Sequence, residues 1–180
     1  MPDVQVVFSD ALNKAREKTE RLITIRERSA YELRTRLLQA GFSAEIARIE
    51  TERAQNAGLI DDERFTRLYV SSKLNAGWGR NRIASEMKRF GIDLTHKEGY
   101  PEDYFPEGVE LERAIACIER FHTTAKDERG ARFRRLMGRG FTVETAKRAL
   151  AGCPERMRSD VLEQPQNHCS WRPESSERAC

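Results

Sequence analysis

The sequence predicts an all-α protein built from tandem three-helix units, because one helix stop signal recurs at an almost constant spacing. Gly41, Gly91 and Gly140 each follow an apolar helical pattern and precede one apolar residue and one side chain that can cap a new helix. These glycines are 50 and 49 residues apart. A single unit of this size buries little apolar surface, so neighbouring units should share a core. We therefore expect an elongated, curved, solenoid-like body.

The composition agrees with a small helical array and leaves no room for a second large domain. The chain has 180 residues, of which 34% are charged and 38% are hydrophobic, so we expect a thin core and an extensive solvated surface. A formal net charge of only +3 argues against a polybasic protein that wraps nucleic acid. No apolar run reaches the roughly 18 residues of a membrane helix, and the start of the chain lacks a secretory signal pattern. We expect a cytoplasmic protein with no membrane partner.

Each unit should contain a connecting helix followed by a helical hairpin that the glycine turn closes. Apolar residues at helical spacing predict the connecting helices over residues 10–28, 62–76 and 107–121. Residues 95–106 contain one glycine and two prolines, so the last helix of the second hairpin should be no longer than about one turn. The expected segments are an N-terminal extension (1–9), three three-helix repeats (10–60, 61–106 and 107–151) and a disordered tail (152–180).

The first hairpin shows how these helices are expected to begin and end. Ser29 is the first residue of a capping box, in which its side chain accepts from an early backbone N–H and Glu32 reaches back to the Ser29 N–H. Gly41 ends that helix in the left-handed conformation. Ser43 then caps a third helix, which should end near Gly58.

The segment GLIDDERF joins the first two units and contains two adjacent carboxylates, which could suggest a metal or acid–base site. Adjacent side chains at a helix start point apart, however, and either aspartate is a good N-cap for the helix that follows. Leu59 and Ile60 should then be core residues that hold the turn. We interpret the segment as a structural motif made of Gly58, Leu59, Ile60, Asp61, Asp62 and Phe65.

No enzyme, cofactor or metal motif meets its chemical requirements in this sequence. Residues 77–80, GWGR, lack the upstream strand and the lysine of a phosphate-binding loop, so they should form a tight turn in which Trp78 packs on a neighbour or stands exposed. His96 and His122 have no nucleophile or carboxylate at catalytic spacing. The cysteines include no pair at the spacing of a zinc site. We predict a protein without catalytic residues, cofactor or metal.

Charge is distributed unevenly, with a net of −4 over residues 95–125 and +5 over residues 126–151. Basic residues also precede the glycine turn in every unit, so a stacked array would place them along one flank. There their side chains could bind carboxylates or phosphates, although a solvated helix face is the alternative. The candidate contact residues are Arg34, Arg36, Arg80, Arg82, Lys88, Arg89, Arg132, Arg134, Arg135 and Arg139.

Several separated motifs occur in the order found in one known family. They are RERSAYELRTRL, GLIDDERF and YVSSKLNAGWGRNRIASEMKRFGI, and over roughly residues 10–151 the sequence resembles the RecX family of recombination regulators. The resemblance implies tandem three-helix units, no catalytic activity, and binding to the RecA nucleoprotein filament, whose ATPase, strand exchange and co-protease activities such proteins usually inhibit. The sequence departs from the family at EGYPEDYFPE, where a helix is usual, and after Ala151.

Two functions therefore stay open. The first is a monomeric modulator that lies along a RecA filament, with weak contacts to single- or double-stranded DNA. The alternative is a helical module that binds DNA directly, because short hairpins with a basic second helix also describe helix-turn-helix proteins. The mosaic of acidic and basic segments favours a long protein partner of mixed charge over naked DNA.

Overall fold

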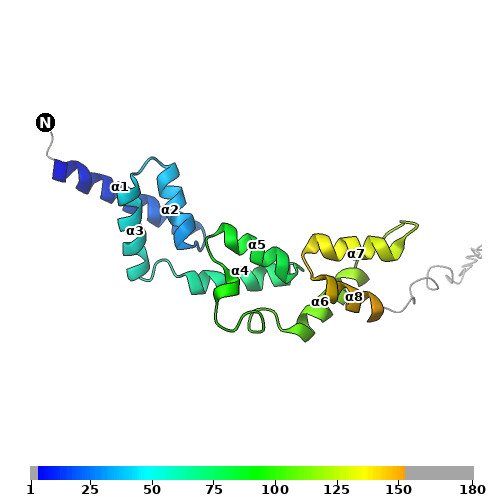
Figure 1. Ribbon diagram of the computed structural model, residues 1–180. Coiled ribbons are helices and arrows are strands. Elements are labelled where there is room, and N and C mark those ends of the chain that lie inside the picture. The colour runs from blue at the N-terminus through cyan, green and yellow to red at the C-terminus, as the bar shows by residue number, and fades with distance from the viewer. Residues whose placement is uncertain (1–3, 153–180) are drawn as a thin grey trace, which may run out of the picture.

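The computed structural model describes residues 4–152, and all regular secondary structure in this range is helical. The helices form three units that follow one another in an elongated row (Figure 1). The prediction of an all-α tandem array is confirmed, and none of the described helices is long and apolar enough to cross a membrane. The helices are α1 (Val4–Ile25), α2 (Ala30–Gln39), α3 (Ala44–Asn56), α4 (Asp62–Asn75), α5 (Arg80–Arg89), the 3-10 helix η1 (Leu94–His96), α6 (Glu107–Glu119), α7 (Glu128–Arg139) and α8 (Val143–Gly152).

Each unit has its own apolar core. The first centres on Leu33 and Leu37 of α2, the second on Ile83 and Met87 of α5, and the third on Leu136 of α7. The extensive helix packing is confined to α1–α3, to α4–α5 with η1, and to α6–α8. The expectation of a core shared between units is therefore wrong. Polar contacts between helix ends join the units instead.

The glycine turns end the hairpin helices as expected. Gly41, Gly91 and Gly140 have φ values of 90°, 77° and 86°, a region that L side chains rarely adopt. In each turn the N–H of the following apolar residue bonds to the carbonyl five residues earlier, at 3.2, 3.0 and 3.1 Å. This bond closes the helix end and turns the chain toward the next element.

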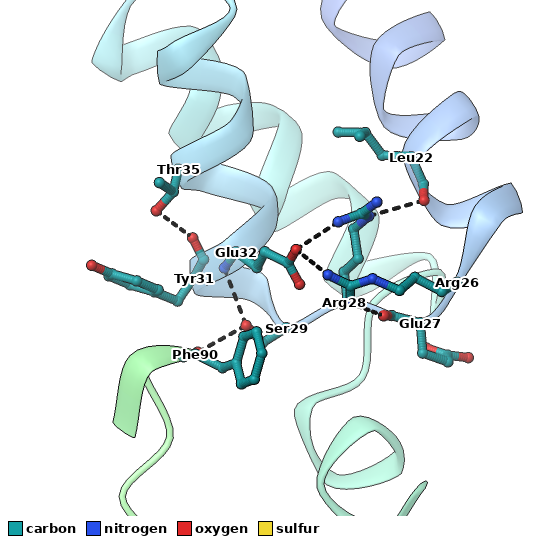
Figure 2. A network of polar contacts seen from close by, with 9 residues as sticks. All are labelled: Leu22, Arg26, Glu27, Arg28, Ser29, Tyr31, Glu32, Thr35 and Phe90. Atoms are coloured by element: carbon teal, nitrogen blue, oxygen red, sulfur yellow. Dashed lines mark hydrogen bonds and ion pairs between the residues drawn. The ribbon is translucent and has the colours of Figure 1, made fainter. Parts of the chain in front are cut away.

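Helix starts follow the predicted caps, with one exception. The Ser29 and Ser43 hydroxyls accept from backbone N–H groups three residues later, at 3.1 and 3.3 Å. The second half of the predicted capping box is wrong, because Arg26 and Arg28 both donate to the Glu32 carboxylate (Figure 2). Arg28 also donates to a carbonyl in the last turn of α1, so that helix ends three residues before its expected end.

The two outer limits of the repeat array also differ from the sequence expectation. Helix α1 begins at Val4, so residues 4–9, expected as an extension, continue the first helix. The expected disordered tail lies outside the described residues, apart from Gly152, which ends α8. The second hairpin ends in the three-residue η1, as its prolines and glycine predict. The loop that follows buries Phe105, which supplies apolar surface that a longer third helix would otherwise contribute.

The contacts of the GLIDDERF segment agree with a structural role, except at Leu59. Ile60 and Phe65 are buried, whereas Leu59 is 36% exposed, so its predicted core position is wrong. Leu59 and Ile60 both donate a backbone hydrogen bond to the Ala54 carbonyl, and the chain at this turn directs only one of the two side chains inward. Gly58 has a φ of 68° and permits the turn.

Candidate functional site

The junction between the first and second units is built on the N-terminus of α2. The Ser29 hydroxyl donates to the Phe90 carbonyl at 2.8 Å, next to the glycine turn that ends α5 (Figure 2). The Ala30 backbone N–H donates to the Asp62 carboxylate at 2.8 Å. Glu27 and Arg64 form an ion pair at 2.8 Å across the same junction. The hydrogen bond with Glu27 raises the pKa of the Arg64 guanidinium above its usual range.

The two aspartates of the motif therefore have different roles. Asp61 is the N-cap of α4, and its carboxylate accepts from the backbone N–H groups of Glu63 and Arg64 at 2.8 and 3.0 Å. These bonds, first the one from Arg64, hold the pKa of Asp61 below its usual range. Asp62 instead caps a helix of the preceding unit. The capping prediction is confirmed for Asp61, whereas Asp62 joins two units.

The junction between the second and third units repeats this arrangement. The backbone N–H groups of Gly79 and Asn81, at the start of α5, donate to the carbonyls of Arg139 and Gly140 at 2.8 and 3.0 Å. The Arg80 N–H donates to the carboxylate of Glu110 on α6, at 3.3 Å. At both junctions, the N-terminus of a hairpin helix thus contacts a glycine turn and a carboxylate of the next unit.

An arginine-lined groove lies at this second junction, and we define it as the arginine groove. It has a volume of about 450 Å³ and is lined by Arg82, Arg134, Arg135, Gly138 and Arg139. The Arg82 guanidinium lies 3.9 Å from the Trp78 ring centre, and that of Arg135 lies 5.3 Å from the Phe121 ring centre. Stacking on aromatic faces holds the guanidinium groups while their N–H donors stay available.

The arginines of this groove have few acidic partners. The carboxylate of Asp127 lies 3.7 Å from Arg134, and both side chains of that pair are 68% exposed. Arg82 and Arg139 donate to the backbone carbonyls of Gly138 and Ala76, at 3.4 and 3.1 Å. Four of the five residues that line the groove are arginines and none is acidic, so the groove is positively charged. It is suited to bind carboxylates or phosphates.

An adjoining cavity adds two arginines that the sequence analysis missed. It has a volume of about 380 Å³ and shares Arg135 and Arg139 with the arginine groove. Arg113 of α6 and Arg120, the C-cap of that helix, line its other side. They lie seven residues apart, which places them on one face of the helix. Their seven-residue spacing indicates a shared helix face, but the net charge of residues 95–125 is negative, so the segment did not suggest a basic surface.

The other predicted contact residues lie outside the arginine groove, and several have structural partners. Arg80 pairs with Glu110, whose side chain is 5% exposed, at 3.6 Å. Arg132 is only 15% exposed and pairs with Glu128 at 2.6 Å. The remaining four are exposed on the first two units: Arg34 and Arg36 on α2, Lys88, which pairs with Asp93, and Arg89, which pairs with Glu86.

The repeat-related groove at the first junction has a different character. Tyr31 and Arg36 of α2 line it on one side. Glu86 and Arg89 of α5, with the C-cap Phe90, line it on the other. Its mixed charges and aromatic rings contrast with the four arginines of the second junction. The predicted flank of arginines is therefore continuous only between the second and third units. Within residues 4–152, no group of acidic, histidine and cysteine side chains is arranged to hold a metal ion.

Comparison with known proteins identifies the family. The family model of the RecX second three-helix domain matches residues 61–95. The regulatory protein RecX of Mycolicibacterium smegmatis is 39% identical over 74 residues, an alignment that spans 41% of this chain and 39% of that protein. The regulatory protein RecX of Acidithiobacillus ferrooxidans is 34% identical over 142 residues, covering 76% of this chain and 88% of that protein.

Solved structures show the same fold at lower sequence identity. The crystal structure of RecX from Lactobacillus salivarius matches with a TM-score of 0.68 and 15% identity, over 79% of this chain and 96% of that one. A second crystal structure of a regulatory protein RecX matches with a TM-score of 0.65 and 16% identity, over 79% of this chain and 73% of that one. The alignment with the Acidithiobacillus protein spans most of both chains and shows that this chain belongs to the RecX family of regulatory proteins.

Proposed function

We propose that this protein regulates homologous recombination and DNA repair by binding the RecA nucleoprotein filament. Membership of the RecX family supports this partner. The elongated row of units supports it as well, because a long narrow body can contact more than one subunit of a helical filament (Figure 1). The expected result of binding is inhibition of the ATPase, strand exchange and co-protease activities of RecA.

The arginine groove is the observation that indicates which residues would contact the filament. Arg82 comes from the second unit, and Arg134, Arg135 and Arg139 come from the third, so the groove exists only where the two units are joined. Planar guanidinium groups bind carboxylates in two-pronged geometry, which suits an acidic surface on a protein filament. A filament subunit bound at this junction would be held by the protein, which would restrict its movement relative to neighbouring recombinase subunits.

A pair of variants tests this assignment. Arg134→Ala with Arg135→Ala should weaken binding to a RecA filament at least about tenfold and release inhibition of its DNA-dependent ATPase. Both side chains are exposed, so helicity and the thermal midpoint should stay unchanged. Arg16→Ala with Lys18→Ala on α1 is the matched control, because it removes the same charge from exposed positions of the first unit. Equal loss in both double variants would assign the effect to net charge alone.

A second candidate, direct binding to DNA, is supported by the adjoining cavity. Arg113 and Arg120 extend the positive surface beyond the arginine groove, and arginines gathered in this way also suit successive phosphates. A titration of labelled single and double strands, without recombinase and at several salt concentrations, separates the two. Tight, steeply salt-dependent binding that Arg113→Ala with Arg120→Ala abolishes would favour DNA as the main partner. Weak binding at physiological salt would leave RecA as the main partner.

A further inference from the structure

The first helices of the three hairpins, α2, α5 and α7, lie head to tail. The C-terminal turn of α7 meets the N-terminus of α5, and the C-terminal turn of α5 meets the N-terminus of α2 (Figure 1). We call this sequence α7–α5–α2 the helix row. Each contact brings the partial positive charge of a helix N-terminus to the partial negative charge of a C-terminus. The row therefore ends in two complementary surfaces, the C-terminus of α2 and the N-terminus of α7.

The C-terminal end of the row has the same turn as the two junctions. Gly41, Gly91 and Gly140 share a positive φ and the same backbone hydrogen bond. A Cβ built on Gly91 would lie 2.5 Å from the Tyr31 Cβ, and one built on Gly140 would lie 2.3 Å from the Arg82 Cβ. Over Gly41, nothing lies within 4 Å. In residues 4–152, this is the glycine turn of the row that no helix N-terminus covers.

The N-terminal end of the row has the matching element. The residues that cover Gly91 and Gly140 are the second residue of α2 and the third residue of α5. The second residue of α7 is Arg129, which is exposed. None of the three glycine turns within the described chain lies against it. Asp127 caps this helix through the Gly130 N–H at 2.8 Å, so its first turn is already formed and ready to dock.

We propose that two copies of this protein join end to end, with the N-terminus of α7 in one copy docked on the Gly41 turn of the next. This contact continues the interface that already joins the units within one chain. Arg129 would take the place of Arg82, whose guanidinium donates to the Gly138 carbonyl in the last turn of α7 at 3.4 Å, so its positive charge would face the carbonyl-rich end of α2. The contact repeats a head-to-tail operation, so it builds open rows rather than closed dimers.

The association should be weak in dilute solution, because one helix-end junction buries far less than the roughly 1,200 Å² of a stable interface. The protein is then a monomer when dilute and forms short rows when crowded. A partner that holds copies in line would raise their effective concentration and make the contact cooperative. The contact itself needs no recombinase, so it can be tested on the protein alone.

Sedimentation velocity from about 10 µM to 1 mM provides the test, a range chosen for a weak interface. The sedimentation coefficient of the unaltered protein should rise with concentration. Ala40→Lys places an ammonium group beside the Gly41 turn, where it repels Arg129 of the docked copy, and should abolish the rise. Ala57→Lys is the matched control, because Ala57 is also an exposed C-cap before a positive-φ glycine but ends α3, outside the row.

Mixing two blocked variants tests the direction of the contact. Arg129→Glu should block the α7 end of the row, because its negative charge would face the carbonyl-rich end of α2. Helix α7 itself should stay stable, since a glutamate is favourable in the first turn of a helix. Each variant alone should stay monomeric, and an equimolar mixture should associate. A constant sedimentation coefficient of the unaltered protein up to about 1 mM would overturn the proposal. So would a monomeric mixture, or an Ala57→Lys effect equal to that of Ala40→Lys.

Discussion

The Asp62 carboxylate accepts a hydrogen bond from the Ala30 backbone N–H at 2.8 Å and so ties the second unit to the first across 32 residues of chain. Asp62 is the first residue of α4, and Ala30 is the first residue of α2. The Asp62 carboxylate therefore stabilises two helix N-termini. It lies in the first turn of α4, where a negative charge is favourable, and it accepts a hydrogen bond from the first residue of α2. The junction relies on such polar contacts because the apolar cores of the two units are separate.

Asp62→Ala should lower the free energy of unfolding by about 1–2 kcal/mol, since it leaves the Ala30 N–H without its carboxylate. Urea denaturation followed by circular dichroism measures this. Asp10→Ala removes the same charge from an exposed position of α1 and should change stability by less than about 0.5 kcal/mol. Equal stability of the two variants would show that the contact does not hold the junction.

Local sequence rules predicted the helix ends in this molecule well. Ser29, Ser43 and the positive-φ glycines act within five residues of their partners, and short-range rules describe such contacts. The role of Asp62 was not predictable in this way, because its partner is 32 residues away. The same holds for Arg113 and Arg120, which join the positive surface only when α6 packs beside α7.

The candidate site was predicted in part for the same reason. Position within the repeat placed Arg82 and Arg135 on one flank, and they do meet in the arginine groove. Position alone could not distinguish them from Arg80 and Arg132, which neighbouring carboxylates engage. Burial and pairing, which decide whether a guanidinium is available to a partner, are properties of the tertiary fold.

Gly79 should be essential to the second junction because there is no room for a side chain at this position. Its φ is −85°, which any residue adopts, but a Cβ there would lie 2.3 Å from the Phe141 backbone nitrogen. Gly79→Ala should therefore separate the second and third units and cost about 2–4 kcal/mol of stability. Gly108→Ala is the control: nothing lies within 4 Å of its added Cβ in α6, so that variant should gain about 0.5 kcal/mol. Thermal unfolding distinguishes these outcomes.

Trp78 should report on the arginine groove by fluorescence. The Arg82 guanidinium lies 3.9 Å and the Lys73 ammonium 4.8 Å from its ring centres, so an anion that draws Arg82 away will change the indole emission. Trp171→Phe removes the other tryptophan and leaves a single reporter. Addition of an acidic peptide should then shift the emission maximum, and Arg82→Ala should remove most of that response. An unchanged spectrum at saturating peptide would place acidic partners outside this groove.

Asp93 should make stability depend on pH in a defined window. Hydrogen bonds from the Thr95 side chain and backbone, and then from Lys88, lower the pKa of Asp93 to about 2 from an ordinary 3.8. The folded state therefore favours the ionised carboxylate. This contribution is complete above the unfolded pKa and is lost as pH falls from about 3.8 through about 2. Because protonation would weaken the cap of η1, acid should loosen the end of the second hairpin first.

Asp93→Asn tests this assignment without removing the cap, since the asparagine side-chain oxygen can still accept from the Thr95 N–H. The variant should lose stability at neutral pH, where the charged bonds to Thr95 and Lys88 are missing, and the difference from the unaltered protein should shrink as pH falls toward 2. Asp103→Asn, at an exposed position of the following loop, is the control and should give no such convergence. A difference that stays constant from pH 7 to about 2 would show that Asp93 acts through shape rather than charge, because only a charged group couples folding to proton binding.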